Sequence, residues 1–397
     1  MLRFAPSPTG DMHIGDLRVA ILNYLYAQQK GEEFIVRIED IDQATSVAGK
    51  DEEILMILEK FALPHAQLYH QRENLHMHQT LAIKLLQEEK AFVCLCQSED
   101  QTAVSQCHGN CENTQVKLAQ LKEDRTPFSI HLKKTNNIED VTLLKIDGIP
   151  TTLFATACDD MLSGVTTIIR EDKHISNTPK QRHIQAMLGY SETIDAIHLP
   201  SLENDNIPSV KSLLEEGFLP DAIINYLLLL GNETSTEIFT LPQAITFLNI
   251  QETSKGGVKF DWDKLRFINC EHLKMMDDKK ISSLFGFADS DIGKLAKLYL
   301  AEASTINELE AKIKPIFSKK DFSGELGKEM AIIQKIILEA PMINEFDTFK
   351  QYIMDHSKIE SEALDKSLRV LITGVQIGPE LEQIYTLIKS YITEVVA

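Results

Sequence analysis

Leu2–Gly15 has the sequence LRFAPSPTGDMHIG, in which a short apolar run leads into a turn. Pro6 and Pro8 restrict the backbone after the apolar residues and Gly10 permits a turn, so a strand followed by a loop is predicted. The apolar residues that follow Gly15 include Leu17, Ala20, Ile21, Tyr24 and Leu25. Their helical spacing predicts an amphipathic helix directly after the loop.

A second buried strand is predicted at Phe34–Ile38, which reads FIVRI and follows Gly31. A strand, a helix and a strand within about 40 residues are typical of a βαβ unit with a parallel sheet. Ligands of such sheets bind beyond the carboxyl ends of the strands. We therefore expect residues 3–13 and 39–42 to lie together at that edge.

The rest of the chain divides by its pattern of apolar residues. Residues 51–90 show a helical pattern, a polar cysteine-containing stretch follows, and an apolar β-rich pattern returns at Val141–Leu144 and continues to Ile169. Beyond Ser209 the helical pattern continues to Val396. We predict a Rossmann-like α/β domain (1–90 and 141–208), an inserted module (91–140) and an all-α half (209–285 and 286–397).

Composition narrows the function. The chain has 397 residues, of which 43% are hydrophobic and 25% charged, typical of a soluble protein with several domains. No apolar run approaches the roughly 18–20 residues of a membrane span, and the N-terminus lacks the layout of a secretory signal, so a cytoplasmic location is expected. The net charge of −19 favours a metabolic enzyme, and any nucleic-acid partner would need local basic patches.

Four of the six cysteines crowd into one segment as Cys94-x-Cys96, ten residues, and Cys107-x-x-x-Cys111. Four thiolates suit structural Zn²⁺, with His108 as a competitor for the fourth ligand position. Because the protein supplies every ligand, the metal would hold the insertion together rather than take part in chemistry. The alternative is a set of buried or free thiols.

The start of the predicted helix has features of a phosphate site. A helix N-terminus attracts phosphate, and Gly15 would let the backbone approach a ligand. His13 can donate to a phosphate oxygen whose charge grows in a transition state. The alternative is a strand-to-helix turn with an incidental histidine.

These motifs resemble the bacterial glutamyl-tRNA synthetase family of class I aminoacyl-tRNA synthetases. The resemblance covers Arg3–Gly15, including His13-Ile14-Gly15, and Phe34–Asp42, and it extends over nearly the whole chain. Further matching segments are Asp159–Met161, Ile168–Arg170, Ser176–Gln181, His198–Pro200, Glu215–Pro220, Phe260–Trp262, Leu368–Val370 and Gly378-Pro379.

The resemblance implies a role for each matching site residue. Arg3 and Arg170 would bind the γ-carboxylate of glutamate, and Ser7 and Glu39 its α-carboxylate and α-amino group. The implied ATP-binding residues are Ala5, Thr9, His13 and Gly15, of which His13 and Gly15 would also be catalytic. Mg²⁺ would accompany the ATP phosphates, and zinc would occupy the insertion.

The chain also departs from the family pattern. Thr152 and Thr156 stand where the family has Tyr and Asn, and Asp16 follows the His13-Ile14-Gly15 motif. The family segment Arg-Gly-Glu-Asp-His reads Arg170-Glu171-Asp172-Lys173-His174 here.

The second family signature, Lys-x-Ser-Lys-Arg, has no counterpart in Ser201–Pro208, which contains no lysine. A second shortening falls between Asn137 and Ile138. One hypothesis is that the natural chain carries further residues at both places, which an intact mass near 44.8 kDa would contradict.

The implied activity is ATP-dependent attachment of L-glutamate to tRNA-Glu, tRNA-Gln or both through a glutamyl adenylate, by a monomer. The alternatives are a catalytically impaired tRNA-binding paralogue and an enzyme that glutamylates a modified base, queuosine, in tRNA. The helical half argues against the queuosine enzyme, which lacks it.

Basic residues in the second half, with Phe260 and Trp262 among them, are candidates for tRNA contact. They are Lys255, Lys259, Lys264, Arg266, Lys274, Lys279, Lys280, Lys312, Lys314, Lys319, Lys320 and Lys328.

Overall fold

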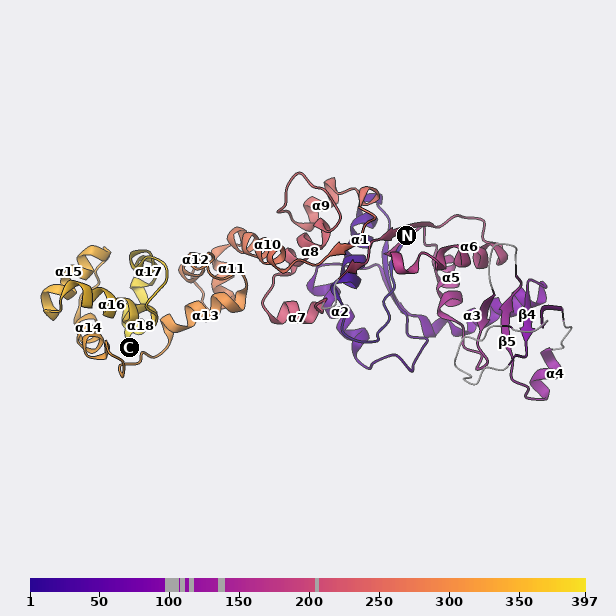
Figure 1. Ribbon diagram of the computed structural model, residues 1–397, viewed down its shortest axis with the longest axis horizontal. Coiled ribbons are helices and arrows are strands. Elements are labelled where there is room, and N and C mark those ends of the chain that lie inside the picture. Colours follow the sequence, from indigo (N-terminus) through magenta and orange to yellow (C-terminus); the bar gives the residue numbers. More distant parts are fainter. Residues whose placement is uncertain (97–106, 108–110, 114–117, 135–139, 204–206) are drawn as a thin grey trace. The chain divides into compact units, whose positions relative to one another are not determined.

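The structure is a computed structural model that describes residues 1–96, 107, 111–113, 118–134, 140–203 and 207–397 (Figure 1). The chain forms two compact units. Unit 1 contains residues 1–212 and 224–260, and unit 2 contains residues 213–223 and 261–397. Among the residues described, no helix combines the length and apolar character needed to cross a membrane.

Unit 1 is built on a five-stranded sheet in which every neighbouring pair of strands is parallel. Its order is β3 (Gln67–His70), β2 (Phe34–Ile38), β1 (Leu2–Phe4), β7 (Thr167–Glu171) and β8 (Asp195–Leu199). The predicted βαβ unit is confirmed, since β1, α1 (Ile14–Lys30) and β2 follow one another and β1 pairs with β2. The strand order reverses direction between β1 and β7, the place where open α/β sheets bind ligands.

Helix α1 packs on the sheet through its apolar face. Leu17, Ala20, Ile21 and Leu25 are fully buried, as their spacing predicts. On the same helix the buried Arg18 donates to the carbonyl oxygens of two distant residues, Pro200 at 2.9 Å and Leu230 at 2.7 Å. A buried cation thus fixes the chain after β8 against α1. Gly31 ends the helix with a φ of +64°, a conformation that favours glycine.

Two expectations for the front half are wrong in part. Residues 51–90 contain β3 between α2 (Lys50–Lys60) and α3 (Leu75–Gln87), whereas a helical pattern was predicted throughout. β3 is an edge strand with an exposed start, so its sequence QLYH lacks the apolar run of a central strand.

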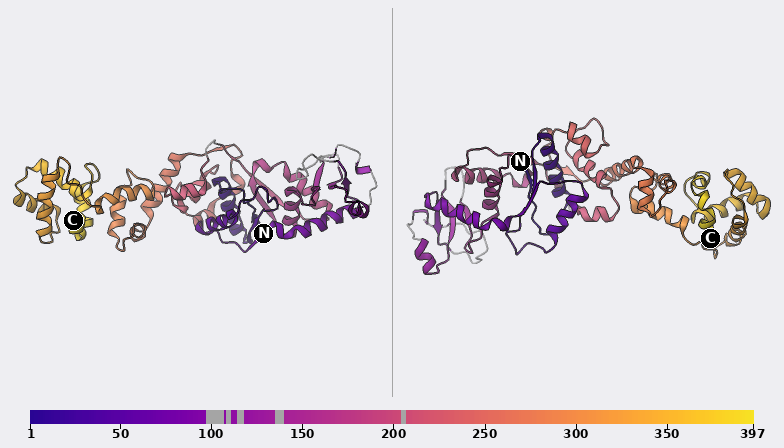
Figure 2. Two further views of the ribbon diagram at one scale, coloured as in Figure 1. Left: turned by 90° about the horizontal axis from the view of Figure 1, so that it is seen from below. Right: turned by 180° about the vertical axis from the view of Figure 1, so that it is seen from behind.

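The second error concerns the apolar segment Val141–Leu144. It forms β6 outside the parallel sheet, in an antiparallel sheet ordered β4 (Ala91–Cys94), β5 (Ser129–Leu132) and β6. This sheet shares a core with α3, α5 (Thr152–Leu162) and α6 (Asn177–Met187). Figure 2 gives two further views of the ribbon, in the sequence colours of Figure 1. An apolar strand pattern predicts burial but does not name its partner strand.

The second half is mainly helical, as predicted. The exception is β10 (Val258–Lys259), which pairs with β9 (Leu202–Glu203) in unit 1. Leu295, Ile333, Leu368 and Ile384 belong to the apolar core of unit 2. The borders predicted at 208/209 and 285/286 remain predictions. The remaining helices are α4 (Leu118–Glu123), α7 (Val210–Glu215), α8 (Pro220–Leu229), α9 (Leu241–Phe247), α10 (Trp262–Met275), α11 (Asp278–Leu284), α12 (Asp291–Leu298), α13 (Ile306–Phe317), α14 (Gly327–Glu339), α15 (Phe346–Ser357), α16 (Ser361–Thr373), α17 (Leu381–Ile388) and α18 (Ile392–Val396).

Unit 2 depends on a close approach between α11 and α12 at Gly293. A Cβ added there would overlap the carbonyl oxygen of Asp278, so the backbone would have to shift. We expect Gly293→Ala to lower the free energy of unfolding by about 1–3 kcal/mol. Gly324→Ala is the control, because no atom lies within 4 Å of that added Cβ. Urea denaturation measures both, and equal stability of the two variants would contradict this packing.

Candidate active site

A cavity of about 600 Å³ opens at the carboxyl ends of β1, β2 and β7. It lies where the strand order reverses, as expected for this edge. Of the predicted site residues, those that line it are Arg3, Ala5, Ser7, Thr9, His13, Glu39 and Arg170. The structure therefore brings together residues that are up to 167 positions apart in the sequence. Gly15 does not line the cavity.

Two buried arginines face this cavity with different partners. The Nε of Arg3 donates to Asp160 at 3.2 Å, whereas an Nη of Arg170 donates to the hydroxyl of Thr178 at 2.8 Å. Within the described part of the chain, the Nε of Arg170 has no hydrogen-bond partner and no carboxylate lies within ion-pair distance of its guanidinium. Burial, together with the nearby Arg3, lowers the pKa of Arg170 to about 10, so it stays charged at neutral pH. Such a cation suits an acidic ligand.

Glu39 is held at the end of β2 by two donors. Arg37 and the hydroxyl of Thr156 each donate to the same carboxylate oxygen, Oε1, at 3.0 Å. Thr156 therefore supplies a hydrogen bond at a position where the resemblance leads one to expect Asn. These contacts fix the orientation of a carboxylate that can accept from an ammonium group in the cavity.

Arg37 is itself fully buried and links Glu39 to Asp160. Its second Nη donates to Asp160 Oδ1 at 2.6 Å. Burial alone would raise the pKa of Asp160, but Arg3 and Arg37 outweigh it and hold that pKa below its ordinary value. Burial likewise opposes the charge on Arg37, but Asp160 and Glu39 raise its pKa above the ordinary value. Arg37 and Asp160 are therefore both charged at neutral pH.

The start of α1 forms another part of the cavity wall, through His13 and Asp16. His13 is exposed and forms a β-bridge with Ser209, and the N–H of Val210 donates to Met12 at 2.8 Å. The carboxylate of Asp16 accepts the backbone N–H of His13 at 3.4 Å, so this acid caps the helix. His13 is therefore positioned on the cavity, where its ring can reach a ligand.

Gly15 lies against the side chain of Glu171 and does not line the cavity. A Cβ added there would lie 2.8 Å from Oε1 of Glu171, whose other oxygen pairs with Lys173 at 2.5 Å. Burial, and secondarily the charge of Glu171, raise the pKa of Asp16. Lys173 is the one lysine among the described residues that line the cavity.

Sequence reasoning missed the residues behind the cavity wall. Arg37 and Asp160 carry no prediction, although each has a signal. Arg37 interrupts the apolar strand FIVRI, and Asp159-Asp160 ends an otherwise apolar stretch of α5. A charged residue within a buried element has to be paired, which would have marked both as members of an ion pair.

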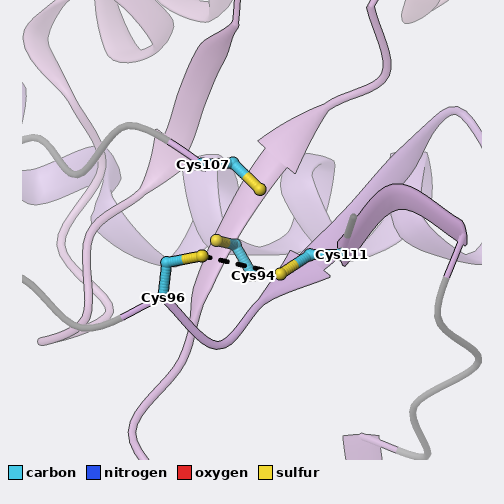
Figure 3. Close-up of side chains that lie close together, drawn as sticks. All are labelled: Cys94, Cys96, Cys107 and Cys111. Atoms are coloured by element: carbon cyan, nitrogen blue, oxygen red, sulfur yellow. Dashed lines mark hydrogen bonds between the residues drawn. The ribbon is translucent and has the colours of Figure 1, made fainter. Parts of the chain in front are cut away.

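The predicted metal ligands also come together. Figure 3 shows the thiols of Cys94, Cys96, Cys107 and Cys111 pointing toward one another, and their sulfur atoms all lie within 4.8 Å. Four sulfurs tetrahedrally bound to zinc at about 2.3 Å would be about 3.8 Å apart. The separation of 3.7 Å between the sulfurs of Cys96 and Cys111 fits this arrangement. The competing ligand His108 lies outside the described residues.

A series of hydrogen bonds connects this cysteine cluster to buried polar side chains. The backbone N–H of Cys107 donates to one carboxylate oxygen of Asp140 at 2.8 Å. The other oxygen of Asp140 lies 3.0 Å from Nδ1 of His131. On the far side of the same ring, Nε2 of His131 lies 2.9 Å from the hydroxyl of Ser129. Ser129 and His131 are fully buried. Such outer contacts orient metal ligands.

Comparison with known proteins decides the family. Residues 1–117 and 112–267 match the family described as tRNA synthetases class I (E and Q), catalytic domain. The chain is 50% identical to Glutamate–tRNA ligase 2 of a Sulfurovum species, with 100% of each chain covered. This chain belongs to the glutamate–tRNA ligase family. Glutamate–tRNA ligase 1 of a Nitratiruptor species is 41% identical to it, again over 100% of each chain.

Solved structures agree with this family in fold. The crystal structure of a glutamate tRNA ligase from Elizabethkingia meningosepticum in complex with its amino acid has a TM-score of 0.79 and 21% identity. It covers 99% of this chain and 97% of that chain. A glutamate-tRNA synthetase from Elizabethkingia anophelis has a TM-score of 0.77 at 21% identity, covering 99% and 98%.

This chain has fewer residues than its alignment to a relative has positions. The alignment to the Sulfurovum relative spans 427 positions for a chain of 397 residues, so at least 30 positions have no residue of this chain. Of the segment Ser201–Pro208, residues 204–206 lie outside the described part. Its described start, Leu202–Glu203, forms β9.

Two residues proposed for an RNA-binding surface of this family member are corrected. Phe260 is buried and packs edge-to-face on Tyr226, with ring centroids 5.4 Å apart. Lys320 is buried and donates to the carbonyl oxygens of Pro315 and Ile316, each at 2.7 Å. Neither side chain is available to contact RNA, because Phe260 is packed in the apolar core and the ammonium group of Lys320 is bonded to carbonyl oxygens at the end of α13. Trp262 is 39% exposed.

Proposed function

We propose that this chain attaches L-glutamate to tRNA in an ATP-dependent reaction that proceeds through a glutamyl adenylate. The observation that carries the proposal is the buried Arg170, a cation without a carboxylate partner among the described residues, in a cavity at the sheet's ligand-binding edge. Its sequence relatives, at 50% and 41% identity over their full length, are named glutamate–tRNA ligases.

The cavity supports a division of roles. Arg3 and Arg170 would bind the γ-carboxylate of glutamate, while Ser7 and Glu39 bind its α-carboxylate and α-amino group. The α-carboxylate attacks the α-phosphate of ATP and pyrophosphate leaves. A ribose hydroxyl at the end of tRNA then attacks the adenylate carbonyl and releases AMP. Orientation of the two reactants and stabilisation of the phosphate charge would both accelerate the reaction.

The ATP end of the cavity has its own residues. Ala5 and Thr9 line it beside His13, which would donate to a phosphate oxygen as its charge grows. Gly15 would contribute indirectly, by admitting the Glu171 carboxylate against the start of α1. Mg²⁺ would neutralise the phosphates, and the four cysteines would hold a structural Zn²⁺ that takes no part in the reaction.

The test is aminoacylation with radiolabelled glutamate and two purified substrates, tRNA-Glu and tRNA-Gln. Charging of either tRNA, with glutamate-dependent pyrophosphate exchange that requires tRNA, is the expected result. A chain that binds tRNA without exchange would be the catalytically impaired paralogue instead. Gel filtration would test the predicted monomer, and the cytoplasmic location remains a prediction.

A further inference from the structure

Helix α5 carries two adjacent buried carboxylates that serve different networks. The exposed fraction of Asp159 is 1% and that of Asp160 is 0%. Asp159 accepts from the side chains of Gln71 and His78, each at 2.8 Å, and from that of Asn74 at 3.3 Å. None of these residues is among the described residues that line the cavity. Asp160 instead accepts from Arg3 at 3.2 Å and Arg37 at 2.6 Å.

One oxygen of Asp160 therefore holds two strands in place. Arg3 belongs to β1 and Arg37 to β2, which are neighbours in the sheet, and both arginines donate to Oδ1. Arg37 also fixes the position of Glu39, because its other Nη donates to the Glu39 carboxylate at 3.0 Å. We propose that Asp160 is the positioning residue that sets Arg3, and through Arg37 also Glu39, for binding the amino acid. This inference rests on the proposed function.

Charge balance agrees with an acidic amino acid. Arg3, Arg37, Asp160 and Glu39 are joined by hydrogen bonds, and the charge of Arg170 lies near them without a direct bond. These five side chains together carry one net positive charge. Glutamate carries two carboxylates and one ammonium group, so it brings one net negative charge, whereas glutamine is neutral. Asp160 contributes both charge and geometry to this balance, and the two contributions predict opposite effects when it is replaced.

Asp160→Asn separates geometry from charge in the full-length chain. If net charge alone mattered, removing a carboxylate would strengthen glutamate binding. Positioning predicts that the KM for glutamate rises roughly 10- to 100-fold, since the carboxylate that both buried arginines share becomes a neutral amide, whose oxygen is a weaker acceptor and whose NH2 group cannot face a guanidinium. The KM for ATP should stay within about twofold, because the ATP end of the cavity does not contact Asp160.

Asp159→Asn is the matched control, because it removes a neighbouring buried carboxylate from the same helix and should leave the KM for glutamate near the wild-type value. Asp160→Glu keeps the charge and displaces the carboxylate by one methylene, so positioning again predicts a raised KM for glutamate. Thermal melting would show whether Asp160→Asn folds. If it does not fold, Asp160→Glu tests the proposal in its place.

Three results would overturn the inference. They are an unchanged or lower KM for glutamate in the folded Asp160 variants, an equal rise in the KM for ATP, or an equal rise in Asp159→Asn. Calorimetric titration of L-glutamate in the presence of tRNA measures binding apart from turnover. A wild-type chain that binds glutamate but charges no tRNA would contradict the proposed function while the Asp160 comparison still stands.

Discussion

Arg170→Gln is expected to lower kcat/KM for glutamate by about 10³-fold, because it removes a desolvated cation that, under the proposed function, would face a substrate carboxylate. Arg170 is 8% exposed and its Nε has no partner among the described residues, so its charge is available to a ligand. Glutamine keeps a hydrogen-bond donor at the site but no charge. Steady-state aminoacylation over a range of glutamate concentrations measures the effect.

The loss should fall mainly on the KM for glutamate, with the KM for ATP nearly unchanged. Arg182→Gln is the control, since this exposed arginine of α6 donates only to the carbonyl of Ile194, at 3.3 Å, among the contacts described. Activity of Arg170→Gln within tenfold of the wild type would show that the amino acid binds elsewhere. It would also remove the main support for the proposed function.

Cys111→Ala is expected to release the metal and unfold the module around β4, β5 and β6. Structural zinc contributes apparent binding free energies of about 10–16 kcal/mol in small domains, so loss of one of four thiolates removes much of the module's stability. Elemental analysis should find about one zinc per wild-type chain and almost none in the variant. Limited proteolysis should then cut within residues 91–144.

Cys270→Ala provides the control for this variant. Cys270 lies in unit 2, where its thiol donates to the carbonyl oxygen of Leu300 at 3.4 Å, whereas the four clustered cysteines belong to unit 1. Its replacement should change neither metal content nor proteolysis. Equal metal content in wild type and Cys111→Ala would show that these cysteines are not zinc ligands.

Local pattern predicted the elements that lie in the centre of the fold. β1, α1 and β2 follow from one apolar run, one helical repeat and a second apolar run, because burial on both sides demands such patterns. β3 was missed since an edge strand needs no apolar run. Val141–Leu144 was placed in the Rossmann-like domain, whereas it forms β6 of the separate antiparallel sheet, because an apolar run favours a strand without specifying the strand that pairs with it.

The sequence by itself determined the class of the fold, the edge of the sheet where the site lies, and the cysteine cluster. Each depends on residues close together in the chain, or on the rule that parallel strands end at one edge. Only the tertiary structure decided that Asp160 joins Arg3 to Arg37, that Arg170 lacks a carboxylate partner in the described chain, and that Phe260 and Lys320 are buried. Pairing and desolvation depend on which distant segments meet, and spacing along the chain does not contain that information.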